Sequence, residues 1–181
     1  MNGPAPFIVT AELPADLFSW ADGLRRAHFP PERNHLAAHV TLFHAFAPSL
    51  RAELLVLLKA LAARHAPVPA RVMGLMNLGR GTAIALESPA MLALRQALAD
   101  HFHGALTAQD QHPPRLHITI QNKVDPAAAR ALQAALAGAI PARAFAFTGL
   151  GLHLYRGGPW EAAGIFPFRG KQVVDRAGRR G

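Results

Sequence analysis

Two four-residue patterns, each reading His, apolar, Thr, apolar, constrain the fold of this chain more than any other feature. They occupy residues 39–42 (HVTL) and 117–120 (HITI). On a β-strand, successive side chains point to opposite faces, so each pattern gives one apolar face and one face with an imidazole beside a hydroxyl. The sequence therefore predicts two strands, each with one buried face and one reactive face.

The two patterns occupy matched places in an internal repeat. Three pairs of equivalent residues are separated by 75, 78 and 76 positions: Pro14 and Pro89, His39 and His117, Arg80 and Arg156. The order β-α-β-α-β is expected twice, over about residues 5–80 and 81–168, and so long a period indicates a duplication rather than a solenoid. We therefore expect a single bilobal α+β domain over residues 1–168. A pseudo-two-fold axis would place both patterns in a central cleft between two mainly antiparallel sheets.

Hydrophobic periodicity and turn residues give the expected elements. Besides the strands that carry the two patterns, strands are expected at about 7–13, 71–78, 82–86, 143–155 and 161–168. Helices are expected at about 14–27, 48–61, 88–102 and 125–138. Ser88 is expected to cap the third helix, with Pro89 in its first turn.

The formal net charge of +8 and the sequence pI of about 11.4 favour an anionic partner such as RNA, a nucleotide or a phosphate ester. An equally good interpretation is that Arg is simply abundant, because part of the charge lies in residues 169–181, a basic tail expected to be flexible. The absence of cysteine excludes a disulfide framework. With neither a signal peptide nor a membrane span recognised, a cytoplasmic protein with no membrane partner is expected, as a monomer.

The chemistry expected of the paired patterns follows from their side chains. His39 and His117 can divide the roles of general base and general acid, because imidazoles titrate near neutral pH. Which of them is the base stays open. Thr41 and Thr119 can donate hydrogen bonds to the oxygens of an anion held between them; the alternative is that they merely satisfy the backbone or favour a strand.

At these residues the chain resembles the 2H phosphoesterase superfamily, in particular its bacterial branch of 2'-5' RNA ligase-like proteins and 2',3'-cyclic phosphodiesterases. The resemblance covers about residues 5–168, but its specific part is the two patterns. It implies metal-free attack on a cyclic phosphate or phosphodiester at an RNA terminus or a small nucleotide. One His would activate water or a ribose hydroxyl, the other would protonate the departing ribose oxygen, and both Thr hydroxyls would bind non-bridging oxygens.

Five further residues are candidates for substrate contacts. Many family members place an Arg shortly after the second motif, where this chain has Lys123, a point charge without bidentate geometry. Phe43 is expected on the face of His39 and Thr41, where its ring could stack on a base or simply pack in the lobe. The turn at residues 155–160 offers Tyr155, Arg156 and Trp160 to the cleft mouth, or forms an exposed hairpin. By the same alternation His44 is expected on the opposite face, with a structural role.

No cofactor and no metal are expected. His101 and His103 diverge on a helix, His112 has no matching acidic motif, and no phosphate-binding Gly-rich loop is present. The expected function is thus a metal-independent phosphoesterase that hydrolyses or reversibly ligates 2',3'-cyclic phosphate or 2'-5' phosphodiester bonds. The alternative is a non-catalytic RNA- or nucleotide-binding module that uses the same cleft.

Overall fold

The computed structural model describes residues 5–171. Two four-stranded antiparallel sheets form its centre, with strand orders β2-β1-β7-β8 and β5-β4-β3-β6. The strands are β1 (Phe7–Glu12), β2 (Val40–Phe46), β3 (Val68–Asn77), β4 (Thr82–Glu87), β5 (His117–Gln121), β6 (Arg143–Phe147), β7 (Gly149–Leu154) and β8 (Glu161–Pro167). The helices are α1 (Ala15–His28), α2 (Arg51–Arg64), α3 (Pro89–His101) and α4 (Pro126–Ala135), with short 3-10 turns at Pro31–Arg33 and Pro48–Leu50.

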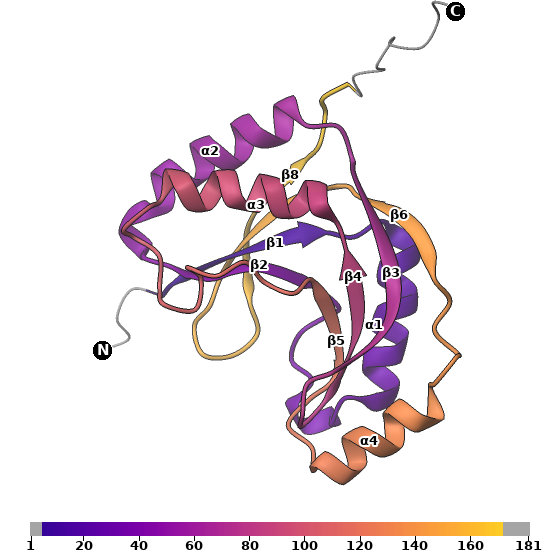
Figure 1. The fold of residues 1–181 in the computed structure, drawn as a ribbon. Helices are drawn as coiled ribbons and strands as arrows, with labels where there is room; N and C mark the ends of the chain where they lie inside the picture. The colour runs from indigo at the N-terminus through magenta and orange to yellow at the C-terminus, as the bar shows by residue number, and fades with distance from the viewer. Residues whose placement is uncertain (1–4, 172–181) are drawn as a thin grey trace, which may run out of the picture.

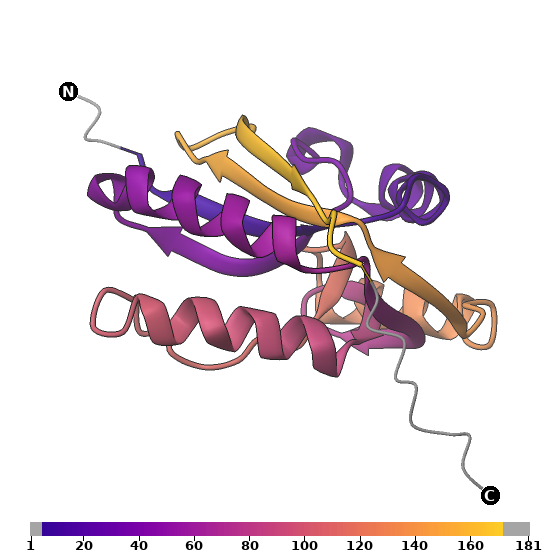
Figure 2. The ribbon, with the colours of Figure 1, turned by 90° about the horizontal axis from the view of Figure 1, so that it is seen from above.

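The helices pack against the two sheets (Figure 1 and Figure 2). Helix α2 packs on β7 and β8 of the first sheet, whereas α3 and α4 pack on β3 of the second. Helix α1 follows a strand of the first sheet but packs on β5 of the second. The α+β architecture with two antiparallel sheets therefore agrees with the sequence-based expectation.

Helix α3 shows why these segments fold as predicted. The Ser88 side chain accepts a hydrogen bond from the Met91 amide at 3.1 Å, and Pro89 occupies the first helical turn. Met91, Leu94 and Leu98 are buried, as their helical spacing predicts. Helix α4 is shorter than expected, because it ends at Ala135 rather than near Gly138.

One expected strand is two strands in two sheets. The prediction of a continuous strand over 143–155 is wrong: β6 pairs with β3 in the second sheet, and β7 pairs with β1 in the first. The chain changes sheets at Thr148, whose amide donates to the Glu12 carbonyl at 2.9 Å. The next residue, Gly149, has to be glycine, because a Cβ at this position would lie 2.5 Å from the Phe166 carbonyl oxygen of β8.

Each sheet mixes strands from both halves of the expected repeat. Strand β3 precedes residue 80 but lies in the second sheet, and β7 and β8 complete the first sheet. The division into repeats at 5–80 and 81–168 stays a prediction. Of the expected tail, Arg169 donates a backbone hydrogen bond to the Ala62 carbonyl in the last turn of α2, and Gly170 donates one to the His65 carbonyl just after that helix. Residues 172–181 lie outside the described range. No helix among residues 5–171 has the length and hydropathy needed to cross a membrane.

Candidate functional site

The two His-x-Thr patterns meet at one cavity. His39 directly precedes β2 and His117 begins β5, and these strands belong to different sheets. A cavity of about 590 Å³ is lined by His39, Thr41, His117 and Thr119. The expectation that both patterns face a common cleft is therefore confirmed.

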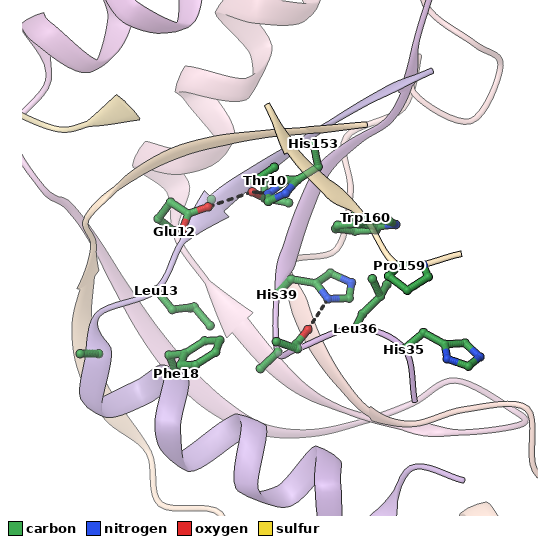
Figure 3. A pocket seen from close by; sticks show the side chains of 15 residues that line it. Thr10, Glu12, Leu13, Phe18, His35, Leu36, His39, His153, Pro159 and Trp160 are labelled. Atoms are coloured by element: carbon green, nitrogen blue, oxygen red, sulfur yellow. Dashed lines mark hydrogen bonds between the residues drawn. The ribbon is translucent and has the colours of Figure 1, made fainter. Parts of the chain in front are cut away.

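Both imidazoles are anchored in the same way, each to the backbone two residues earlier. The Nδ1 of His39 lies 2.8 Å from the Ala37 carbonyl oxygen (Figure 3), and the Nδ1 of His117 lies 2.6 Å from the Arg115 carbonyl oxygen. A carbonyl oxygen can only accept, so each Nδ1 carries the hydrogen. In the neutral ring Nε2 then has the free lone pair, which leaves it available for proton transfer.

His39 has a strongly perturbed titration. Burial lowers the pKa of His39 to about 4, because it disfavours the charged form of the ring. The hydrogen bond to Ala37 acts in the opposite direction and raises the pKa. The nearby positive or titratable groups of three residues lower it further: Arg25, His153 and His117. The His39 ring is therefore neutral at pH 7. A neutral imidazole with Nδ1 bonded to a carbonyl presents a basic Nε2.

Trp160 is the predicted contact residue that lies closest to this chemistry. Its ring centroid lies 4.5 Å from that of His39 and 5.4 Å from that of His153. Trp160 also lines the cavity that holds the four motif residues. The indole therefore packs against the His39 ring at the wall of this cavity.

Three other candidates for substrate contacts do not line this cavity: Lys123, Tyr155 and Arg156. Tyr155 is exposed, and Arg156 pairs with Glu161 at 3.0 Å on the surface. Lys123 is exposed at a turn with a φ of 60°, and its carbonyl accepts from Arg33 at 3.2 Å. Their contact with a substrate stays a prediction.

The expectation that Phe43 shares the face of His39 and Thr41 is wrong. The register between β1 and β2 shifts between Val9, opposite Phe43, and Thr10, opposite Thr41. This irregularity reverses the alternation beyond Leu42. Phe43 is consequently 0% exposed within the core, whereas His44 lines the cavity in its place.

His44 is held by Asp110, a residue that no sequence motif singles out. The Asp110 carboxylate accepts from the His44 amide at 2.9 Å, the Ala45 amide at 3.0 Å and the His44 ring at 3.0 Å. Burial raises the pKa of Asp110, but these hydrogen bonds outweigh it, so the pKa lies below its ordinary value. The ionised carboxylate therefore fixes the bulged end of β2 against the wall of the cavity.

Two buried arginines tie each motif strand to the helix of the other half. Arg25 of α1 donates to the Thr119 carbonyl at 2.9 Å and to the Leu36 carbonyl at 2.8 Å. Arg95 of α3 donates to the Leu42 carbonyl at 3.3 Å and to the Asp110 carbonyl. Sequence reasoning misses both, although a signal exists: each falls on the apolar stripe of its helix, where a charge is rarely buried without partners.

The arrangement can therefore transfer protons on two sides of an anion. It brings the imidazoles and hydroxyls of both motifs into one cavity with the buried Arg95, and His44 and His112 line the same cavity. Among residues 5–171, no three His, Cys, Asp or Glu side chains gather as a metal site would require.

Comparison with known proteins agrees with the fold and identifies a family. The model of the 2'-5' RNA ligase superfamily matches residues 13–159. No curated protein matches the chain significantly. Among solved structures, TT0787 of Thermus thermophilus is 18% identical with a TM-score of 0.64, over 92% of this chain and 99% of that one.

Two further structures show the same fold. A phosphoesterase is 19% identical with a TM-score of 0.60, and LigT of E. coli, crystallised with 3'-AMP, is 18% identical with a TM-score of 0.61. Each alignment covers 92% of this chain and 99% of the other. Since the family model spans most of the sequence and the neighbours share its architecture, the chain belongs to the 2'-5' RNA ligase superfamily.

Proposed function

We propose that this chain is a metal-independent phosphoesterase that hydrolyses or reversibly ligates 2',3'-cyclic phosphate or 2'-5' phosphodiester bonds of RNA or nucleotides. The observation that carries the proposal is the matched anchoring of two imidazoles, each through Nδ1 to a carbonyl, at one cavity with two threonines. A binding module would need neither a base nor an acid in matched positions. The crystals of LigT with 3'-AMP and with NADP+ support a nucleotide as the ligand class.

In the proposed hydrolysis, His39 is the base, because burial keeps its ring neutral. Its Nε2 takes a proton from water as the water oxygen attacks phosphorus. His117 donates a proton from Nε2 to the ribose oxygen that departs on the opposite side. Thr41 and Thr119 donate hydrogen bonds to the non-bridging oxygens, and Arg95 adds a fixed positive charge nearby.

This assignment predicts an unusual pH dependence. A lowered pKa means that the neutral, basic form of His39 persists as the pH falls, and is lost only through about pH 4. The acidic limb of kcat/KM for a 2',3'-cyclic nucleotide should therefore have its midpoint near the His39 pKa of about 4. An acidic limb centred near 6.5, the value of an ordinary imidazole, would contradict the assignment of His39 as base.

A direct assay tests the proposed function. Adenosine 2',3'-cyclic phosphate and adenosine 3',5'-cyclic phosphate are each incubated with the protein in excess EDTA and separated by chromatography. We expect the strained 2',3' ring to be opened to a monoester and the 3',5' ring to survive. Binding of the 2',3' compound without turnover would favour a nucleotide-binding module, and loss of turnover in EDTA would overturn metal independence.

A further inference from the structure

Three aromatic rings form a stack beside the cavity that holds the two motifs, the motif cavity. The Trp160 ring centroid lies 4.5 Å from that of His39 and 5.4 Å from that of His153. Figure 3 shows the indole between the two imidazoles. His39 directly precedes β2, whereas His153 and Trp160 lie on either side of the turn that joins β7 to β8. The stack therefore ties this turn to the start of the first motif.

Hydrogen bonds hold the outer ring of the stack, that of His153. Thr10 Oγ1 donates its only hydrogen to Glu12 Oε1 at 3.0 Å, so His153 Nε2, at 3.0 Å from the same hydroxyl, donates to it. Gly151 leaves the space for this chain of hydrogen bonds, because a Cβ there would collide with side-chain atoms of all three residues. The His153 ring is therefore fixed on the far side of the indole.

Trp160 faces inward from a turn that lies largely at the surface. Tyr155, Arg156 and Pro159 are exposed, and Arg156 pairs at 3.0 Å with Glu161, which is also exposed. Trp160 is half-buried and lines both the motif cavity and a neighbouring cavity of about 510 Å³. The position of the indole therefore depends on what it packs against inside, which includes the two imidazoles of the stack.

The charged and titratable groups that act on His39 each disfavour a charge on its ring. Arg25 of α1, His117 of β5 and His153 of β7 lower the pKa of His39, in addition to the larger effect of burial. Glu12 of β1 lines the neighbouring cavity and accepts the hydrogen bond of the chain that holds His153. The variants described below leave all of these groups in place, as well as the other titratable side chains that line the two cavities: His35, His44, Arg95, Asp110, His112 and Arg115.

An indole against an imidazole has two opposite effects on the protonation of that imidazole. The exclusion of water favours the neutral ring, whereas the π electrons of the indole favour the charged one. A cation–π contact in a desolvated site raises a pKa by about 1.5 pH units, less than the roughly 3–5 by which full burial lowers it. The net effect of Trp160 on His39 is therefore expected to favour the neutral ring.

We propose that Trp160 is a positioning residue for the proposed base: held in place by His153, it fixes the His39 ring with Nδ1 on the Ala37 carbonyl and keeps water from the face of that ring. This role is carried by the stack of three rings and by the hydrogen bonds that fix its outer member. It rests on the proposed function only in taking His39 as the base. Trp160 acts through His39, so its effect exists in the protein without substrate.

Nitrogen-15 NMR of the histidine side chains measures the tautomer and the pKa of His39 without substrate, with its signals identified by their loss in His39→Gln. In the wild type we expect the hydrogen on Nδ1 and a pKa of about 4. In Trp160→Ala the pKa should rise by at least about one pH unit toward the ordinary value of about 6.5, and part of the neutral ring should carry its hydrogen on Nε2. Thr10→Val, which removes the hydroxyl that holds His153, should cause smaller changes in the same direction.

Tyr155→Ala is the matched control, because Tyr155 is an exposed aromatic residue of the same turn that lines neither cavity. Its His39 signals should match those of the wild type. Trp160→Leu keeps an apolar side chain at the site and replaces Trp160→Ala if the latter unfolds at a lower urea concentration. An unchanged or lowered pKa of His39 in the folded Trp160 variants would overturn the positioning role.

Steady-state kinetics with adenosine 2',3'-cyclic phosphate separate this role from a direct contact with substrate. We expect Trp160→Ala to lower kcat at pH 7 roughly tenfold with little change in KM, because the base is less well oriented. A raised KM with an unchanged kcat would assign Trp160 to substrate binding and overturn the proposal. Absence of turnover in the wild type would overturn the proposed function, whereas the NMR comparison needs no turnover and still decides the role of the indole.

Discussion

Replacing either His39 or His117 by Ala lowers kcat for hydrolysis of a 2',3'-cyclic nucleotide by about three orders of magnitude, because each role contributes about 10²–10⁴-fold to catalysis in enzymes generally. Loss of His39 removes the group proposed to accept the proton of water, and loss of His117 removes the group proposed to protonate the ribose oxygen. Both imidazoles are anchored only to backbone carbonyls, at Ala37 and Arg115, so their removal leaves no charged partner unpaired.

The matched control for these variants is His101→Ala. His101 is exposed at the end of α3, bonds to Glu53 at 2.7 Å, and does not line the cavity of the two motifs. Its loss should leave kcat unchanged, and all three variants should unfold at the same urea concentration within error. Activity within about tenfold of wild type in either His39→Ala or His117→Ala would contradict the two-imidazole mechanism.

The second large effect is expected at Arg25, which has no part in the proposed proton transfer itself. Arg25→Met keeps most of the side-chain volume but removes the donors to Leu36, Asn34 and the Thr119 carbonyl. Two of these partners lie in the segment before His39, and the third lies in the second motif. We expect a loss of about 3 kcal/mol in the free energy of unfolding, because three part-buried acceptor oxygens are left without their donor.

The same change should also lower kcat/KM by roughly tenfold to a hundredfold, because it lets the two motifs shift relative to each other. Arg26→Met is the control: Arg26 is the next residue, 70% exposed, and paired only with Asp22 at 3.0 Å. A surface pair of this kind contributes about 0.5 kcal/mol. Urea unfolding and steady-state kinetics of both variants measure the two effects, and equal behaviour of Arg25→Met and Arg26→Met would refute the positioning role of Arg25.

Much of the fold can be predicted from the sequence because the signals for its elements are local. Helix α3 begins where Ser88 and Pro89 predict, and the paired patterns lie on strands because of their alternation. What escapes prediction depends on pairing between distant segments. Nothing within residues 143–155 tells which sheet each part joins, since both β6 and β7 have strand composition; the choice is made by β3 and β1.

The site can be predicted in its centre and not in its surroundings. His39, Thr41, His117 and Thr119 can be named because two His-x-Thr patterns at matched places in a repeat are far more specific than one pattern alone. The burial of Phe43 and the placement of His44 at the cavity cannot be predicted from the sequence. They result from a register shift between β2 and β1, which only the pairing of the two strands shows. The roles of Asp110 and Arg95 likewise follow from contacts between segments far apart in the chain.

In the proposed mechanism, His39 activates the water that attacks phosphorus while His117 protonates the departing ribose oxygen. Phosphorus NMR of adenosine 2',3'-cyclic phosphate, incubated with the protein in excess EDTA and water enriched in oxygen-18, tests it most directly. We predict a single monoester regioisomer that carries one oxygen-18 on phosphorus, formed about a thousandfold more slowly by His39→Ala or His117→Ala. A mixture of 2' and 3' monoesters, or as much product from either variant as from the wild type, would contradict this mechanism.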